Sequence, residues 1–186
     1  GERLSVLKQD HFAYDECTVL DTVLQGHMKL WEVMQEKNAI YLKEDFSDED
    51  GIRAAELEEQ FAGMDGWNAE SDAANLLSGL GIKEHLHYEL MGHLNAKEKV
   101  RVLLAQALFG KPDNLLLDEP TNHLDMEAIQ AVNKGLDAFP GNILLASHDH
   151  ELLQTTCNRV IEFQPDGKII DRLGTYDEYL EWKLAK

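Results

Sequence analysis

The first half of the chain has apolar residues at the spacing that is typical of helices. Residues 18–39 have a helical pattern, with apolar residues at positions 19, 20, 23, 24, 30, 31, 33 and 34. A second helical stretch, 52–62, has apolar residues at positions 54, 55, 57 and 61. Residues 71–90 continue as short helices, because Gly79 and Gly81 interrupt the pattern.

A strong helix is predicted over residues 96–109. Asn95 precedes it and is a favourable N-cap residue, and the side chain of Glu98, three residues further on, can reach back to form a capping box. Gly110 and Pro112 then end the helix.

After residue 110 the pattern changes to strands that alternate with helices. Residues 114–117 and 142–146 are short apolar runs, as expected of strands buried on both faces of a parallel sheet. Further helices are predicted at 126–138 and 150–156, and a hairpin at 159–164 and 167–173. With a short strand at 3–7, this order predicts an α/β fold that has a mainly parallel core sheet and an antiparallel hairpin at one edge.

The composition is that of a globular protein with one substantial core. Of the 186 residues, 44% are apolar, and no apolar run is long enough to predict a membrane-spanning helix. The first residues resemble a strand rather than a signal peptide. Cys17 and Cys157 lie far apart without metal-ligand spacing, which predicts free buried thiols and a cytoplasmic location, where thiols stay reduced.

The chain is strongly acidic. It has 17 Lys and Arg against 35 Asp and Glu, a net charge of −18. Because a surface that binds phosphate backbones is usually basic, we expect no non-specific binding to nucleic acid, although a local basic patch can still dock. Residues 29–72 hold 13 acidic and 4 basic residues. This segment is either a solvated helical hairpin or a protruding arm that touches a partner.

An acidic pair, Asp118-Glu119, follows the apolar run at 114–117. The carboxyl end of a parallel strand is where open α/β sheets bind ligands. One carboxylate there can hold hydrated Mg²⁺, and the next can polarise a water for attack on phosphorus. The alternative is that the pair only caps a helix.

Two further polar residues follow predicted strands. His148 comes after the run at 142–146 and can donate a hydrogen bond to a phosphate oxygen, whereas in the alternative Ser147 or Asp149 caps the next helix and His148 has no role. Gln9 ends the first strand and can ligate Mg²⁺ or orient water. Neither residue is informative alone.

The order of these features resembles the ABC ATPases over nearly the whole chain. The string Asp118-Glu119-Pro120-Thr121-Asn122-His123-Leu124-Asp125 is similar to that of the ABC-F family, soluble ATPases with two tandem cassettes that act on ribosomes. The segment Gly174-Thr175-Tyr176-Asp177-Glu178-Tyr179 and the acidic insertion after Gln9 also resemble ABC-F sequences.

This resemblance implies a role for each matching residue. Gln9 corresponds to the Q-loop glutamine, and Asp118 to the Mg²⁺-binding aspartate of the Walker B motif. Glu119 corresponds to the catalytic glutamate, Asp125 to the D-loop aspartate that couples two cassettes, and His148 to the switch histidine that contacts the γ-phosphate. The implied cofactors are ATP and Mg²⁺, and the implied partners are the second cassette and the ribosome.

The signature motif departs from the family pattern. Where typical ABC proteins have LSGGE, this chain has Leu94-Asn95-Ala96-Lys97-Glu98. The usual serine and glycines let a helix N-terminus approach the γ-phosphate held by the opposite cassette. Asn95 keeps a polar cap, but Ala96 and Lys97 place side chains where a close approach is needed.

The phosphate-binding loop GxxxxGK[ST] does not occur in these residues. In the family it lies upstream of Gln9, so we expect the chain to be a fragment that begins after it and to be inactive alone, within a parent that is a Mg²⁺-dependent ATPase. The expected domains are an incomplete RecA-like α/β core at 1–9 and 110–186 and a helical subdomain at 10–109, with its acidic arm at about 29–72.

Three functions remain open from the sequence. The leading interpretation is a fragment of an ABC-F ATPase that acts on the ribosome in translation control, as the first of two cassettes. The second is the ATPase subunit of a membrane ABC transporter, and the third is a non-enzymatic interaction domain.

Overall fold

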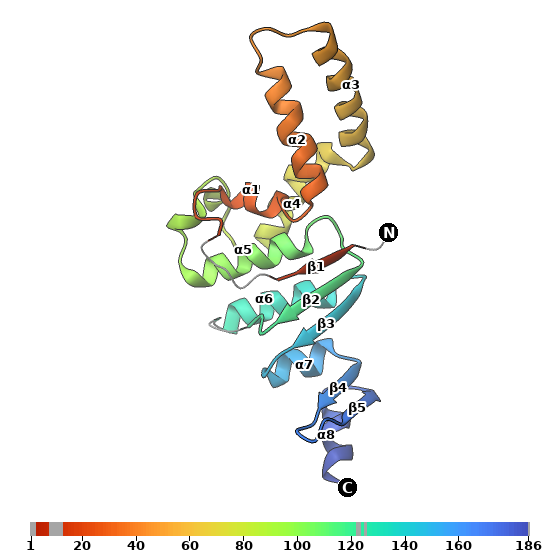
Figure 1. Ribbon diagram of the computed structural model, residues 1–186. Coiled ribbons are helices and arrows are strands. Elements are labelled where there is room, and N and C mark those ends of the chain that lie inside the picture. Colours follow the sequence, from red (N-terminus) through yellow and green to blue (C-terminus); the bar gives the residue numbers. More distant parts are fainter. Residues whose placement is uncertain (1–2, 8–12, 122–123, 125, 186) are drawn as a thin grey trace.

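The computed structural model of the protein describes residues 3–7, 13–121, 124 and 126–185 (Figure 1). Gln9 and Asp125 lie outside these residues. The helical part contains α1 (Val19–Leu24), α2 (Met28–Tyr41), α3 (Asp48–Gly63), α4 (Ala69–Gly79) and α5 (Ala96–Leu108), with short 3-10 turns at Gly66–Asn68, Glu84–Leu86 and Met91–His93. The α/β part follows it in the sequence, except that β1 (Leu4–Val6) precedes the helices.

The helical pattern predicted over residues 18–39 is confirmed, and it is divided between two helices, α1 and α2. A Cβ atom on Gly26 would lie 2.0 Å from the carbonyl oxygen of Gln106, so the chain between α1 and α2 packs directly on the backbone of α5. A new helix then begins, because His27 accepts a hydrogen bond from the N–H of Leu30 through Nδ1 at 3.2 Å.

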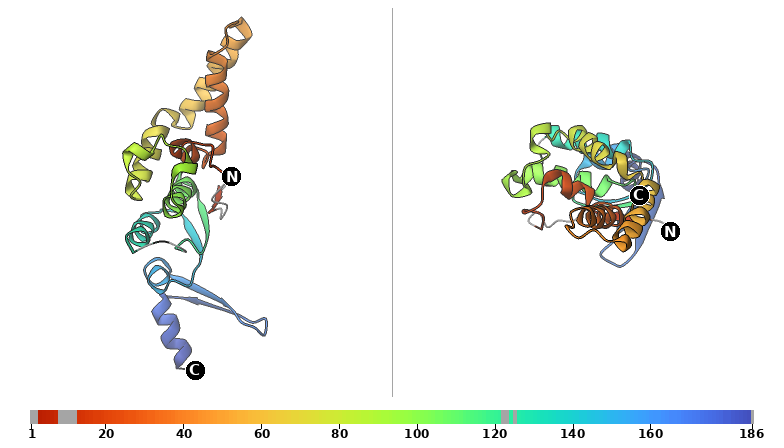
Figure 2. Two further views of the ribbon diagram at one scale, coloured as in Figure 1. Left: turned by 90° about the vertical axis from the view of Figure 1, so that its left-hand side faces the viewer. Right: turned by 90° about the horizontal axis from the view of Figure 1, so that it is seen from above.

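Helices α2 and α3 form a hairpin that projects from the rest of the molecule (Figures 1 and 2). Ser47 and Asp50 form a capping box that starts α3. Arg53 on α3 donates two hydrogen bonds to the carboxylate of Glu36 on α2, at 2.7 and 2.9 Å, and these bonds hold the two helices side by side. The acidic segment is therefore a helical hairpin.

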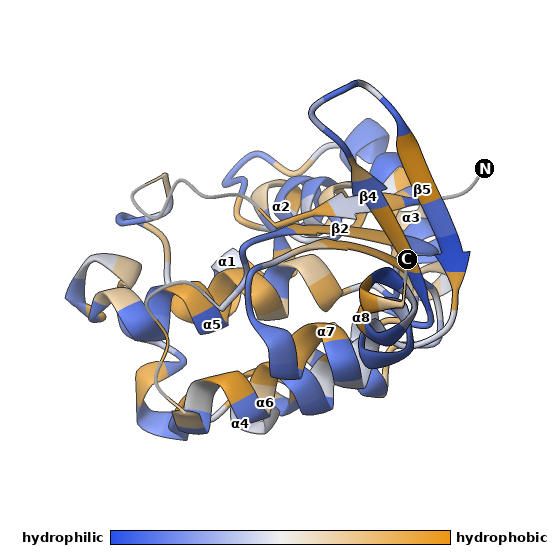
Figure 3. Cartoon of the chain, turned by 90° about the horizontal axis from the view of Figure 1, so that it is seen from below, coloured by the Kyte–Doolittle hydropathy of each residue, from blue (hydrophilic) through white to orange (hydrophobic). Residues whose placement is uncertain are grey.

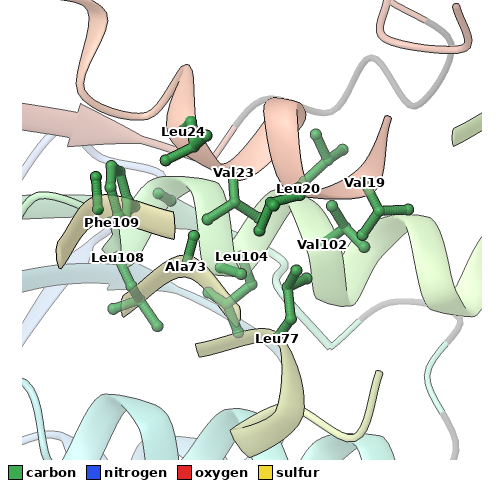
Figure 4. Close-up of a cluster of buried hydrophobic side chains, with 14 of the residues drawn as sticks. Val19, Leu20, Val23, Leu24, Ala73, Leu77, Val102, Leu104, Leu108 and Phe109 are labelled. Carbon is green, nitrogen blue, oxygen red and sulfur yellow. The ribbon is translucent and has the colours of Figure 1, made fainter. Parts of the chain in front are cut away.

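The base of the helical part packs around α5. Apolar residues of α1, α4 and α5 form one buried cluster (Figure 4), which includes Val19, Leu20, Val23, Ala73, Leu77, Val102 and Leu104. Burying a leucine or valine side chain stabilises a fold by about 1.5–3 kcal/mol. This cluster fixes the direction of α5, the helix that carries the signature segment at its N-terminus.

The core sheet is parallel, as predicted. Its order is β1–β2–β3, where β2 is Asn114–Asp118 and β3 is Asn142–Ala146, and Asp118 lies opposite Ala146. Leu115 and Leu117 of the central strand are 1% and 0% exposed, and β2 is hydrophobic over most of its length in Figure 3. Helix α6 (Met126–Asp137) connects β2 to β3. Because all three strands are parallel, their carboxyl ends meet at one edge.

The predicted hairpin is present, as β4 (Arg159–Phe163) and β5 (Ile169–Leu173), but it is a separate sheet. Within the described residues it pairs with no strand of the parallel sheet, so it does not extend that sheet's edge as expected. Helix α7 (His150–Thr156) precedes the hairpin and α8 (Tyr176–Leu184), which the sequence patterns did not predict, follows it. Lys183 of α8 pairs with Glu162 of β4 at 2.6 Å.

Candidate active site

The acidic pair lies at the carboxyl end of the central strand. Asp118 is the last residue of β2 and is exposed, and Glu119 follows it with a side chain that is 21% exposed. The N–H of Glu119 donates a 2.8 Å hydrogen bond to the carbonyl oxygen of Ala146 at the end of β3. The backbone thus holds the pair at the point where two parallel strands end, where α/β sheets bind ligands.

The backbone at Glu119 is strained. Its φ angle is 46°, in the left-handed region that residues other than glycine seldom adopt. Such a conformation costs about 1–3 kcal/mol and persists only where the surrounding structure enforces it, which happens often at active sites. Here the bond to Ala146 precedes the turn, and the buried residues Pro120 and Thr121 follow it.

His148 lies beside Glu119. It follows β3 by two residues, and its Nε2 is 3.4 Å from Oε1 of Glu119, while its N–H donates to Oε2 at 3.4 Å. Both distances are at the long end for hydrogen bonds. The His148 side chain is 99% exposed, so the imidazole can turn from the carboxylate towards a ligand above the sheet edge.

The alternative interpretation, in which residues around His148 cap the next helix, applies to the neighbours of His148. It does not apply to His148 itself. Asp149 accepts a hydrogen bond from the N–H of Leu152 through Oδ1 at 3.1 Å and caps α7. Ser147 accepts one from the N–H of Asp149 at 3.1 Å. Among the hydrogen bonds of the described residues, the imidazole of His148 makes none that starts this helix.

The predicted capping box at the signature segment is present. The N–H of Glu98 donates to Oδ1 of Asn95 at 3.0 Å, and the N–H of Asn95 donates to Oε2 of Glu98 at 3.1 Å. Ala96 and Lys97 are exposed on the first turn of α5. The side chains of Asn95 and Glu98 thus bond to the backbone at the start of α5, and Ala96 and Lys97 form the exposed surface of this first turn.

Helix α5 points its N-terminus towards the same side of the molecule as the Asp118 edge (Figure 1). Its C-terminal end is fixed at the other side, because Arg3, just before β1, donates hydrogen bonds to the carbonyl oxygens of Gly110 and Lys111. The three strands run from the Arg3 side of the molecule towards the Asp118 edge. The axis of α5, followed from its C-terminus to Asn95, runs in the same direction.

An ion pair that the sequence patterns did not reveal supports the signature helix. Nζ of Lys99 lies 2.5 Å from Oδ1 of Asp15, and the Lys99 side chain is 8% exposed. This pair ties the first turns of α5 to the segment that follows Gln9 in the sequence. The two residues are 84 positions apart, so no local pattern could indicate the contact.

The cysteines and clusters of metal-ligating side chains are two other features that can form a site. Both cysteines are free, as predicted, but only partly buried, and burial raises the pKa of the Cys157 thiol, which disfavours the reactive thiolate. In the part of the chain that the structure describes, no group of three or more His, Cys, Asp or Glu side chains is placed to hold a metal ion.

Comparison with known families decides the identity of this arrangement. The sequence model of the family described as "ABC transporter" matches residues 1–122. The chain belongs to the ABC transporter family. This assignment agrees with the resemblance to ABC ATPases that is seen in the motifs after β2 and β3.

Relatives of this ABC protein are ABC-F family ATP-binding proteins. The uncharacterized ABC transporter ATP-binding protein YkpA of Bacillus subtilis is 58% identical over 97% of this chain and 33% of its own length. The energy-dependent translational throttle protein EttA of Mycobacterium tuberculosis is 30% identical over 100% of this chain and 33% of its own length. The chain therefore spans about a third of the length of the curated relatives it matches.

Solved ABC cassettes share the fold. A nucleotide-free ATP-binding cassette from an ABC transporter is 19% identical and superposes with a TM-score of 0.63 over 99% of this chain and 65% of its own length. The ADP- and Pi-bound dimer of the cassette MJ0796 is 17% identical with a TM-score of 0.62, over 92% and 63%. The described helices of the present ABC protein include none that is long and apolar enough to cross a membrane.

Proposed function

We propose that the Asp118 edge is the magnesium and water side of an ATP-hydrolysing site in an ABC-F protein. The observation that carries the proposal is the pairing of Glu119 with His148 at the ends of β2 and β3, at 3.4 Å. The family match and the ATP-binding names of the relatives support it.

Each residue has a separate task in this proposal. Asp118 is an exposed carboxylate at the strand end and suits Mg²⁺, which prefers oxygen ligands and keeps several waters. Bound Mg²⁺ neutralises negative charge on the phosphates. Glu119 accepts the proton of the attacking water as general base, and Gln9 orients that water or completes the metal ligands.

His148 stabilises the γ-phosphate by donating a hydrogen bond from Nε2. The same atom faces Glu119 in the present structure, so its exposed side chain must turn away from the carboxylate when a phosphate binds. Electrostatic stabilisation of the developing charge by hydrogen-bond donors is commonly the largest single contribution to catalysis. Asp125 is proposed to contact the second cassette.

The signature segment is proposed to face nucleotide that the second cassette holds. Asn95 and Glu98 keep the helix end in shape through their capping box, and Ala96 and Lys97 are presented outwards. Replacing Asn95-Ala96-Lys97 by Ser-Gly-Gly in the full-length protein should raise the hydrolysis rate, because the phosphate can then approach the helix N-terminus. An unchanged rate would show that this segment does not face nucleotide.

The finer proposal is a cytoplasmic ATPase that acts on the ribosome in translation control. The name of one relative, the translational throttle EttA, supports it. The test measures ATP hydrolysis by the full-length protein with and without purified ribosomes. A higher rate with ribosomes is expected. A protein that instead sediments with membranes would support the transporter alternative, and a protein whose behaviour never depends on nucleotide would support the interaction domain.

A further inference from the structure

A large cavity lies at the opposite end of the sheet from the Asp118 edge. Its volume is about 1050 Å³, and its walls come from the start of α2, the end of α3, one side of α4 and the end of α6. Arg3, directly before β1, and Lys111, three residues before β2, also line it. The cavity is therefore at the amino ends of the strands, away from the residues proposed to act on ATP.

Basic residues gather around this cavity in a chain that is otherwise strongly acidic. Arg3, Lys29, Lys111 and Lys134 line it, against the two acidic residues Asp65 and Asp72. Among the described residues, no carboxylate forms an ion pair with Lys29, Lys111 or Lys134. The whole chain has 35 acidic and 17 basic residues, so this local excess of positive charge distinguishes the cavity from the rest of the protein.

The pKa of His27 also reflects the positive charge around the cavity. Burial of its ring lowers its pKa, and nearby Arg3 and Lys29 lower it further, against a backbone hydrogen bond that raises it. The ring is thus neutral at pH 7. Because Nδ1 accepts a hydrogen bond from the N–H of Leu30, the proton of the neutral ring is on Nε2. His27 lines the cavity and adds a neutral donor to the lysines.

The floor of the cavity is apolar. Leu30, Leu80, Leu108 and Phe109 are buried members of the main hydrophobic cluster, and each also lines the cavity. Figure 4 shows Leu108 and Phe109 at one end of that cluster. Pockets with apolar walls, a few placed polar groups and volumes of roughly 300–1,000 Å³ are typical of small-molecule sites.

We propose that this cavity binds an organic anion whose apolar body carries a phosphate, sulfonate or carboxylate group. The apolar body covers the leucine and phenylalanine floor, and the anionic group pairs with Lys29, Lys111 and Lys134. Because the walls come from both the base of the arm and α6, such a ligand bridges the arm and the α/β part. Occupancy would then restrict movement of the arm relative to the sheet.

Gly79 offers a way to fill the cavity without disturbing the fold. It is the last residue of α4 and lines the cavity, and a Cβ atom built on it meets no atom within 4 Å. A leucine at this position is compatible with the helix, since leucine has a higher helix propensity than glycine. Gly79→Leu should therefore occupy ligand space and leave the protein folded.

The test uses the anionic fluorophore 8-anilinonaphthalene-1-sulfonate and its uncharged analogue N-phenyl-1-naphthylamine. Both are titrated into the full-length protein with excess ATP present, so that nucleotide sites are filled. The sulfonate should bind saturably and more tightly than the neutral analogue. Gly79→Leu should weaken its binding about tenfold or more, and Lys29→Gln with Lys134→Gln should weaken it by a similar factor, since about 1.4 kcal/mol corresponds to tenfold.

Lys168→Gln is the matched control, because Lys168 is exposed on the distant hairpin and pairs with Asp166. It should leave binding unchanged, and thermal unfolding should show that every variant is folded. Equal binding of the sulfonate to folded Gly79→Leu and unaltered protein would overturn the cavity as the site. Equal affinity for the charged and neutral probes, or no effect of the two lysine changes, would overturn the assignment of an anionic ligand.

Discussion

Nε2 of His148 lies 3.4 Å from Oε1 of Glu119, although the residues are 29 positions apart in the sequence. The parallel pairing of β2 and β3 produces this contact by placing Asp118 opposite Ala146. The proposed base and the proposed phosphate donor thus lie side by side, directly after two neighbouring strands.

His148→Ala should slow ATP hydrolysis by the full-length protein by about 10²-fold, because removal of one fixed donor to a developing oxyanion has this scale. ATP affinity should change little. The measurement is the turnover number together with equilibrium ATP binding. His150→Ala is the control: His150 lies on α7 and pairs with Asp177 at 2.8 Å, so its removal should leave turnover near that of the unaltered protein. Equal loss in both variants would contradict the role of His148.

Lys99→Met should lower the free energy of unfolding by about 1 kcal/mol. The change leaves Asp15 without its buried partner, but Asp15 is 37% exposed and water screens it, so the effect is smaller than for a fully buried pair. Urea unfolding measures the change. Lys168→Met removes an ion pair from a lysine that is 77% exposed and should alter the free energy by less than about 0.5 kcal/mol. Similar losses of stability in the two variants would show that the buried ion pair of Lys99 stabilises the fold no more than an exposed pair does.

The pKa of Asp50 should depend on Lys43. A hydrogen bond from Lys43, at 2.5 Å, and bonds from the N–H and hydroxyl of Ser47 lower the pKa of Asp50 to about 2. A carboxyl whose folded pKa is depressed adds stability above its unfolded pKa of 3.8 and loses it as the pH falls towards 2. The start of α3 should therefore weaken between about pH 4 and pH 2.

Carboxyl carbon NMR titration tests this directly. In Lys43→Met the pKa of Asp50 should rise towards 3.8 while staying below it, because Ser47 still donates. An unchanged Asp50 pKa in this variant would show that Lys43 does not pair with it in solution.

Gly26→Ala should destabilise the fold by about 1–3 kcal/mol, the usual cost of overpacking. The added Cβ would lie 2.0 Å from the backbone oxygen of Gln106, which cannot move as a side chain can. Gly63→Ala is the comparison, because a Cβ there meets no atom within 4 Å, and it should be neutral or stabilising by up to about 1 kcal/mol. Thermal unfolding of both variants provides the measurement, and a Gly26→Ala protein as stable as Gly63→Ala would contradict the packing.

The fold class and the positions of Glu119 and His148 after two strands of one sheet could be predicted because they depend on short-range signals, whereas the contact between the two side chains was not predicted. Apolar runs followed by Asp118-Glu119 and by Ser147-His148 mark two strands, and helices between parallel strands bring the carboxyl ends together. The expected burial of β3 on both faces was wrong, because Leu144 is 62% exposed and the other residues of that strand are exposed or half-buried. The capping box of Asn95 and Glu98 is also local.

The remaining features depend on contacts between distant segments. The break between α1 and α2 results from the packing of Gly26 on Gln106, and the ion pair of Asp15 with Lys99 joins residues that no period connects. The apolar spacing of residues 18–39 continues across the break, so it could not indicate it. The cavity has the same origin, since segments far apart in the sequence form its wall.

The central claim is that Glu119 activates water and Asp118 holds Mg²⁺. The most direct measurement compares Glu119→Gln and Asp118→Asn in the full-length protein, by ATP turnover and by Mg²⁺-dependent ATP affinity. Glu119→Gln should keep the affinity and slow turnover by about 10²-fold or more, the scale for losing a general base. Asp118→Asn should weaken Mg²⁺-dependent binding. Equal loss of affinity in the two variants, or full turnover in Glu119→Gln, would contradict the account.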